Sequence, residues 1–165
     1  MDVRTATVAD VEAIQTVAER SWTEDYPHIT SRETAVEGAH EWYATERVTD
    51  EIERPDAVVF VATKDGEIVG FSHGAWTATD GDVLRVYVDP DHRGEGIGTS
   101  LLDSTVDALF ERDVNEIRAM VLAENEPGNK FYRAHGFEPL DETYKTRILD
   151  EYYEERVWKL TRWES

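Results

Sequence analysis

The spacing of apolar residues along the chain predicts a mixture of strands and helices. Residues 2–6 are typical of a short strand. Thr7 and Asp10 stand three residues apart, the spacing at which two side chains cap each other's free amides at the start of a helix. An apolar stripe follows them to about Ser21, so we expect the first helix here.

The middle of the chain is rich in strand signals. A second capping pair, Thr30 and Glu33, predicts a polar helix that runs toward Val48. Beyond it, Asp65-Gly66 and Asp80-Gly81 are typical of tight turns between strands. We therefore expect strands over residues 57–62, 68–76 and 83–88.

The second half returns to alternating helices and strands. A helix is expected from a helical stripe formed by Ile97, Leu101, Leu102, Thr105 and Leu109. A strand over 117–122 and a short helix over 129–135, ended by Gly136, come next. Two long strands, over 137–148 and 152–160, close the chain. This order predicts an α/β fold in which helices cover the faces of a sheet.

Composition narrows the class of protein. The 165 residues fit one domain, 1–165, and carry 36 acidic against 17 basic side chains. So acidic a chain is not expected to bind nucleic acid or anionic membranes non-specifically. It has no cysteine, no long apolar run and no signal-peptide start, and its five His are scattered. We expect a cytoplasmic protein without a metal.

The acidity itself has two interpretations. The acids are spread along the chain, and the composition resembles that of proteins from salt-accumulating halophilic archaea. A net charge of −19 should strain the compact state at low salt, where screening is weak. An acidic surface that attracts cationic substrates is the alternative, and composition does not separate the two.

One segment is the most informative about chemistry. The predicted strand ending at Val88 runs into the glycine-rich stretch 93–99, which opens a helix. Helix starts present free N–H groups to phosphate, and glycines let the backbone approach it closely. No Lys follows the glycines as in a Walker motif, and their spacing differs from the dinucleotide fingerprint. We infer a diphosphate site of another kind, with a purely structural turn as the alternative.

The spacing that fits is Arg-x-x-Gly-x-Gly, formed by Arg93, Gly96 and Gly98. A second block, residues 125–137, resembles N-x-x-(A/G)-x-x-F-Y-x-x-x-G-F. In both blocks the chain resembles the GNAT superfamily of acyl-CoA-dependent N-acetyltransferases. The resemblance covers nearly the whole chain. It implies the GNAT fold: a mixed, mostly antiparallel sheet of about six to seven strands, flanked by about four helices.

The resemblance also implies a cofactor site for acetyl-CoA. In the family, the strand before the turn splays from its neighbour, binds the pantetheine arm and offers an N–H to the thioester carbonyl. The residues implied as cofactor-binding are Val86, Tyr87, Val88, Arg93, Gly94, Glu95, Gly96, Ile97, Gly98, Thr99, Asn125, Asn129 and Tyr132.

Catalysis of amine acetylation needs a proton acceptor and a proton donor. Tyr132 matches the family's acid position and would protonate the departing thiolate. Asp82 lies early in the strand leading to the turn, where relatives often carry an acid. Several relatives have Glu there or two residues later, where this chain has Leu84. Glu124 is the alternative acceptor of the amine proton. Without Cys, direct attack in a ternary complex is the simpler route.

The acceptor amine belongs to a small molecule or a protein, and the sequence does not choose between them. By resemblance its pocket would draw on Trp22, Glu24, Asp25, Tyr26, His28, His73, Trp76, Tyr144, Tyr152 and Tyr153. Family members often pair their terminal strands, so a homodimer is possible. A non-catalytic acyl-CoA sensor on the same fold is the competing interpretation.

Overall fold

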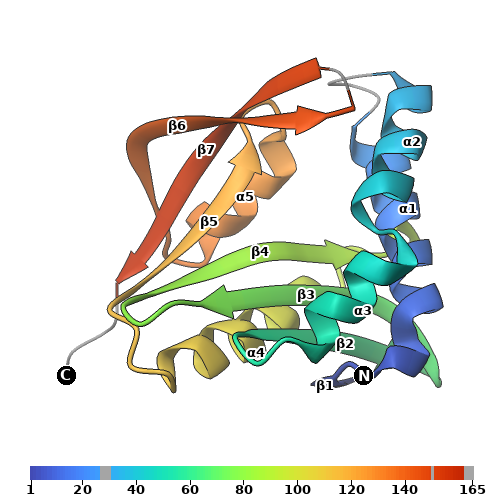
Figure 1. Ribbon diagram of the computed structural model, residues 1–165, viewed down its shortest axis with the longest axis horizontal. Coiled ribbons are helices and arrows are strands. Elements are labelled where there is room, and N and C mark those ends of the chain that lie inside the picture. Colours follow the sequence, from blue (N-terminus) through green and yellow to red (C-terminus); the bar gives the residue numbers. More distant parts are fainter. Residues whose placement is uncertain (27–30, 150, 162–165) are drawn as a thin grey trace.

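The computed structural model describes residues 1–26, 31–149 and 151–161, and a seven-stranded sheet forms its centre (Figure 1). The strand order is β1-β2-β3-β4-β5-β7-β6. Every neighbouring pair is antiparallel except β4 and β5, which run parallel. The strands are β1 (Asp2–Thr5), β2 (Ala57–Lys64), β3 (Glu67–Trp76), β4 (Asp80–Val88), β5 (Glu116–Leu122), β6 (Glu138–Ile148) and β7 (Glu151–Thr161).

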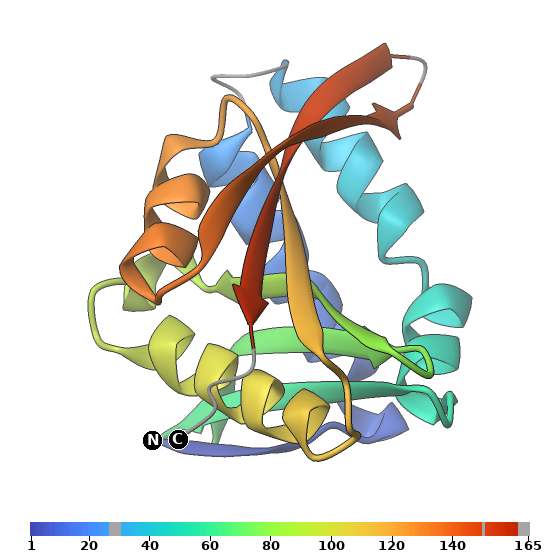
Figure 2. The same ribbon diagram turned by 90° about the vertical axis from the view of Figure 1, so that its left-hand side faces the viewer.

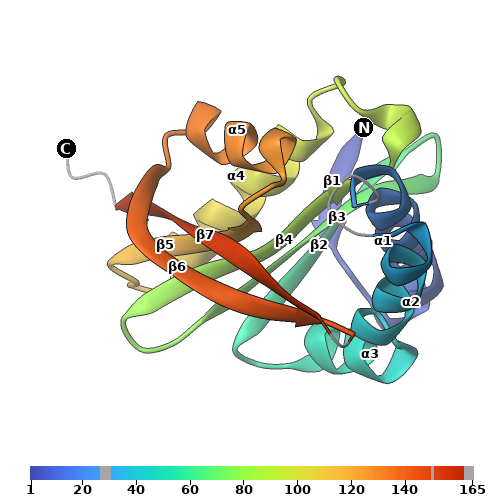
Figure 3. The ribbon, with the colours of Figure 1, turned by 90° about the horizontal axis from the view of Figure 1, so that it is seen from above.

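Helices cover both faces of this sheet (Figures 2 and 3). One face carries α1, α2 and α3, and the other carries α4 and α5. Their bounds are α1 (Val11–Asp25), α2 (Arg32–Trp42), α3 (Thr45–Glu53), α4 (Ile97–Phe110) and α5 (Glu126–Ala134). Two single 3₁₀ turns, Val8–Asp10 and Pro90–His92, precede α1 and follow β4. The predicted α/β GNAT fold is confirmed.

The helix α4 shows how the sequence pattern becomes structure. Its buried residues are the predicted stripe, Ile97, Leu101, Leu102, Thr105 and Leu109. The Thr105 hydroxyl donates to Ser72 Oγ of β3 at 2.7 Å, so the one polar member of the stripe is satisfied. This packing fixes α4, and with it the glycine-rich turn at its start, against the centre of the sheet.

Two local predictions are wrong. Residues 32–53 form two helices, because Ala44 adopts an extended conformation (φ −57°, ψ 145°) and caps α3 without any glycine or proline signal. Asp80-Gly81 begins β4 instead of turning: Gly81 is buried, and a Cβ there would lie 3.4 Å from Leu109. Thr30 lies outside the described residues, and Ser31 caps α2 by accepting from the Thr34 N–H. The turn at Asp65-Gly66 is confirmed by left-handed φ angles of 52° and 81°.

The sheet opens between its two parallel strands (Figure 1). The β4–β5 pairing begins at Asp80 with Glu116 and ends at Val83 with Ala119. Beyond that point neither strand has a partner on this side. Leu84 also lacks a register partner on β3, so β4 carries a β-bulge at the point where it separates from β5. The splay that the family resemblance implies is therefore present.

Candidate active site

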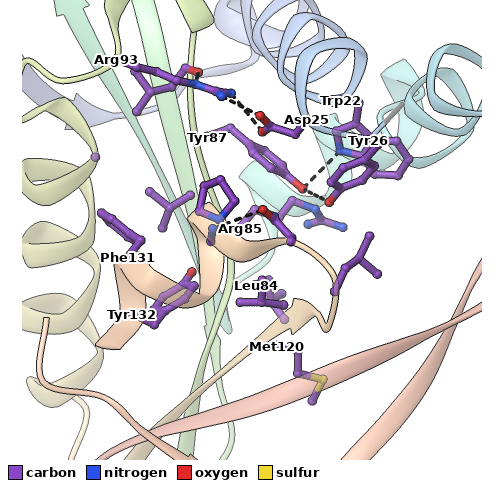
Figure 4. Close-up of a pocket in the computed structure, with 18 of the residues that line it drawn as sticks. Trp22, Asp25, Tyr26, Leu84, Arg85, Tyr87, Arg93, Met120, Phe131 and Tyr132 are labelled. Carbon is purple, nitrogen blue, oxygen red and sulfur yellow. Dashed lines mark hydrogen bonds and ion pairs between the residues drawn. The ribbon is translucent and has the colours of Figure 1, made fainter. Parts of the chain in front are cut away.

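A cavity of about 390 Å³ occupies the gap between the splayed strands (Figure 4). Residues 84–88 of β4 and 120–122 of β5 form its walls, the glycine-rich turn closes one end, and α5 and α1 flank it. Every predicted cofactor-binding residue lines this cavity except Glu95 and Asn129. The fold thus brings together two blocks that lie some thirty residues apart in sequence.

The backbone of β4 turns hydrogen-bonding groups toward the cavity. The Asp89 N–H donates to Val69 O at 2.8 Å, which makes this a hydrogen-bonded pair of the β3–β4 ladder. By the alternation of antiparallel ladders, the main-chain groups of Val86 and Val88 then point away from β3, toward the gap. This arrangement suits an extended ligand that pairs with β4 through amides.

The glycine-rich turn forms a backbone cradle. Gly94 and Gly96 have φ angles of +80° and +83°, and a Cβ built on either would meet no atom within 4 Å. These glycines therefore serve the conformation of the turn and keep its surface open. Helix α4 begins at Ile97, and its first helical bond comes from the Ser100 N–H to Gly96 O. The amides before Ser100 are thus available to an anion.

Helix α1 fastens the end of β4 and the turn. Ser21 Oγ donates to Val88 O at 3.2 Å, and Trp22 Nε1 donates to the Tyr87 hydroxyl at 3.2 Å. Arg93, at the mouth of the turn, donates to both carboxylate oxygens of Asp25, at 2.6 and 3.0 Å. Figure 4 shows this ion pair at one end of the cavity. The predicted anion-binding Arg93 is therefore held by a carboxylate.

The other polar residues of the turn have partners of their own. Glu95 accepts from Lys64 Nζ at 2.6 Å and does not line the cavity. Thr99 Oγ1 lies 2.9 Å from His135 Nε2 and joins the start of α4 to the end of α5. Gly98 approaches the Phe131 ring so closely that a Cβ would lie 3.3 Å from it. These contacts set the turn against α5.

The two asparagines of the second block differ in role. Asn125 is the N-cap of α5: its Oδ1 accepts from the Gly128 N–H at 3.2 Å, and the residue lines the cavity. Asn129 Nδ2 donates to Leu122 O and Asn125 O, while its Oδ1 accepts from Trp158 Nε1 at 2.8 Å. Asn129 thus positions the end of β5 and the start of α5, and its contact with a cofactor stays a prediction.

Tyr132 projects from α5 into the cavity (Figure 4). It is 6% exposed, and its ring packs edge-on against Phe131 and Phe137. Burial raises the pKa of the Tyr132 phenol well above its ordinary value. A phenol is protonated at neutral pH even with its ordinary pKa near 10, as a proton donor must be.

Neither predicted proton acceptor lines the cavity. Asp82 lies in the closed part of the sheet, opposite Arg118 on β5, two residues before the strands part. Burial raises the pKa of its carboxyl. Glu124 is exposed in the turn between β5 and α5. Both assignments stay predictions, and either carboxylate would have to act through intervening groups.

Two charged residues that no sequence motif indicates, Arg85 and Glu155, line the far end of the cavity. Arg85 of β4 donates to Glu51 of α3 at 3.2 Å, and its Nη1 lies 2.6 Å from His73 Nδ1. Its guanidinium also lies 5.9 Å from the centroid of the Trp42 ring. The second charged residue is Glu155 of β7. Apolar side chains of Leu84, Met120 and Ile148 complete this end.

Of the residues predicted to line the acceptor pocket, three line the cavity. Trp22, Asp25 and Tyr26 line the cavity, and Tyr26 shares a hydrogen bond of 3.3 Å with Tyr87. His28 lies outside the described residues. The remaining residues of that set do not line the cavity: Glu24, His73, Trp76, Tyr144, Tyr152 and Tyr153.

Within residues 1–26, 31–149 and 151–161, no three His, Asp or Glu side chains come together as a metal site requires. Among the helices of the same residues, none combines the length and apolar character that crossing a bilayer demands.

Comparison with known proteins agrees with the fold and the cavity. The sequence pattern of the acetyltransferase (GNAT) family matches residues 11–137. The chain therefore belongs to this family.

Three similar proteins of known name can be compared with this chain. A spermidine N(1)-acetyltransferase of Thermoplasma acidophilum is 28% identical over 158 residues, covering 93% of this chain and 98% of the relative. A mycothiol acetyltransferase of Clavibacter sepedonicus is 34% identical over 56% of this chain and 30% of its own length. The crystal structure of a PaiA N-acetyltransferase from Thermoplasma acidophilum, in complex with coenzyme A, superposes with a TM-score of 0.87 at 25% identity, over 98% of both chains.

Proposed function

We propose that this protein transfers the acetyl group of acetyl-CoA to a primary amine, by direct attack in a ternary complex. The observation that carries the proposal is the single cavity in which the free edge of β4, the glycine-rich turn and Tyr132 meet. The PaiA relative was crystallised with coenzyme A, and curated relatives are named as N-acetyltransferases. Both support this assignment.

The residues present fit coenzyme A. The diphosphate would bind the open turn at Gly94 and Gly96, where free amides and the helix dipole favour an anion. The pantetheine arm would pair with the main chain of Val86 and with the Val88 N–H, since Val88 O already accepts from Ser21 Oγ. The acetyl thioester would then lie deeper in the cavity, where a β4 amide can polarise its carbonyl.

In this arrangement Tyr132 acts as the general acid. Attack by the neutral amine forms the C–N bond, and collapse of the intermediate breaks the C–S bond. The Tyr132 hydroxyl donates its proton to the departing thiolate, which leaves as the free thiol.

Acetyl transfer tests the proposal directly. Coenzyme A thiol release is measured with acetyl-CoA and a panel of amines that includes spermidine and an alanine-initiated peptide. We expect turnover with at least one amine, and about a 100-fold or larger loss of kcat in Tyr132→Phe with acetyl-CoA binding retained. Tyr152→Phe, at a 70% exposed position outside the cavity, is the matched control. Tight acetyl-CoA binding without transfer to any amine would favour the sensor interpretation instead.

A further inference from the structure

The cavity holds one carboxylate without a partner. Two of its described lining residues carry carboxylates, Asp25 and Glu155. Asp25 is occupied by the guanidinium of Arg93 at 2.6 Å. In the described part of the chain, no side-chain hydrogen bond or ion pair engages Glu155, and desolvation alone perturbs it.

The position of Glu155 is set by the sheet. It lies on β7 opposite Leu122, at the end of β5, and opposite Tyr144 of β6. The Ala123 N–H donates to Glu154 O at 2.8 Å, which anchors the strand beside it. Glu155 is therefore held on a regular strand at the wall of the cavity, where side-chain direction is well defined.

Its surroundings make an unpaired charge costly. Leu84 and Met120 line the same cavity and expose 45% and 42% of their surface, which is large for apolar side chains on adjoining sheet strands. Burial raises the pKa of the Glu155 carboxyl. A carboxylate kept in such a place without a cation disfavours the folded state unless a ligand supplies the missing charge.

We propose that Glu155 binds the ammonium group of the acceptor and takes the proton that frees its lone pair. This inference rests on the proposed function and assigns the acceptor class, a cationic primary amine whose chain passes Leu84 and Met120. An ammonium near pKa 10.4 is neutral in only roughly one part in a thousand at pH 7, so transfer needs such a base. Glu155 supplies this carboxylate to the cavity from β7.

The proton balance closes with groups already present. Glu155 takes one proton from R–NH₃⁺, and the neutral amine attacks the thioester carbon. When the C–S bond breaks, Tyr132 protonates the thiolate, and the second proton leaving the nitrogen restores the phenol. Glu155 passes its proton to solvent. The products are R–NH–COCH₃, the free thiol and one proton.

Most other charged or titratable groups that face the cavity are either paired with an opposite charge or already protonated, unlike Glu155. Arg85 is neutralised by Glu51, and Arg93 by Asp25. The phenols of Tyr26 and Tyr132 stay protonated because burial raises the pKa of each. The remaining groups are the Tyr87 hydroxyl and the half-buried His92. Glu155 is thus the cavity carboxylate free to gain a proton.

The test compares Glu155→Gln with Glu154→Gln, an adjacent exposed carboxylate outside the cavity. For an amine that the wild type acetylates, we expect Glu155→Gln to lower kcat/KM about 100-fold or more and to lose the acidic limb of the pH–rate profile. Glu154→Gln should keep both. Acetyl-CoA affinity should stay within about twofold in each variant, and the thermal midpoint of Glu155→Gln should not fall, since the removed charge has no partner.

Three results would overturn the inference. The first is wild-type kcat/KM in Glu155→Gln. The second is an activity loss matched by Glu154→Gln, which would mean a general charge effect. The third is a large loss in Asp82→Asn with none in Glu155→Gln, which would assign the proton to β4. If the wild type itself neither binds acetyl-CoA nor transfers acetyl, the proposed function fails first, and the binding titration makes that failure visible separately.

Discussion

The guanidinium of Arg93 binds the carboxylate of Asp25 through two hydrogen bonds, of 2.6 and 3.0 Å. This pair joins the glycine-rich turn to α1 at the mouth of the cavity. The same guanidinium is the group expected to meet a diphosphate. If a diphosphate binds there, it would compete with Asp25 for Arg93.

Replacement of Asp25 should reveal this competition. In Asp25→Asn the guanidinium no longer has to leave a carboxylate, and a repulsive charge near the diphosphate is removed. Because a part-exposed ion pair contributes up to about 1 kcal/mol, we expect acetyl-CoA to bind about fivefold more tightly. Calorimetric titration measures the change. Asp91→Asn, which removes an exposed carboxylate paired with Arg20, controls for net charge. Equal effects in both variants would show that Arg93 does not exchange partners.

The open turn predicts a second difference between matched variants. Gly96→Ala and Gly66→Ala both place a Cβ at a left-handed φ, +83° and +81°, with no atom within 4 Å. Each should cost roughly 1–2 kcal/mol of stability from backbone strain. Only Gly96→Ala, at the cofactor cradle, should also weaken acetyl-CoA binding, by about tenfold or more. Thermal melts and titrations measure the two quantities. Equal acetyl-CoA affinity in the two variants would argue against a diphosphate at the turn.

Buried His73 predicts a loss of stability in mild acid. It is 4% exposed beside Arg85, and burial, with the nearby Arg85, lowers the pKa of its imidazole to about 3. In the unfolded chain the His73 imidazole has an ordinary pKa of about 6.5, so between about pH 6.5 and pH 3 the unfolded chain binds a proton that the folded chain does not. The stability contributed by the neutral imidazole is therefore full above pH 6.5 and falls as the pH drops. From pH 7.5 to pH 5 this amounts to about 2 kcal/mol.

The measurement is the difference between variants, since Glu51 and the surface acids also titrate. His73→Asn keeps an acceptor near Arg85 without the titration, so its stability relative to the wild type should improve by about 2 kcal/mol between pH 7.5 and pH 5. His40→Asn, the same substitution at an exposed position, is the control. A parallel pH dependence of the wild type and His73→Asn would contradict the assignment.

The net charge predicts that the stability of the fold depends on salt. With a charge of −19 on 165 residues, self-repulsion should fade as the screening length falls from about 10 Å at 0.1 M to 3 Å at 1 M. We expect the thermal midpoint to rise by about 5–10 °C from 0.1 to 2 M KCl. The same series with an uncharged solute at matched osmolality measures how much of the change in the thermal midpoint is unrelated to charge. A midpoint that does not move would end the halophilic interpretation.

Local signals in the sequence were sufficient for much of the architecture. The α4 stripe from Ile97 to Leu109 repeats with the helix period, and Asp65-Gly66 has the residues that a tight turn needs. The break at Ala44 carries no such signal: Ala44 caps α3 without a side-chain hydrogen bond, next to the buried Tyr43. Asp80-Gly81 has a turn signature that burial against Leu109 overrides.

The candidate site divides in the same way. The glycine turn and Tyr132 stand in contiguous motifs, so both could be found from the sequence. Asp82 was expected near the reacting groups. Whether it lies beside the cavity depends on where β4 and β5 separate, which is after Val83. The pairing of distant strands decides that point, and no local sequence signal marks it. Glu155 is one of 36 acidic residues, and its sequence neighbour Glu154 looks the same. Only the pairing of β7 with β5 directs Glu155 to the cavity.

The central claim is that the splayed strands and the glycine-rich turn bind acetyl-CoA. Calorimetric titration with acetyl-CoA in molar KCl, with ATP and NAD as comparison ligands, tests it most directly. The account predicts micromolar binding of acetyl-CoA, at least about tenfold tighter than either comparison ligand. Absence of acetyl-CoA binding by a protein shown to be folded in that salt, or equal binding of all three ligands, would contradict it.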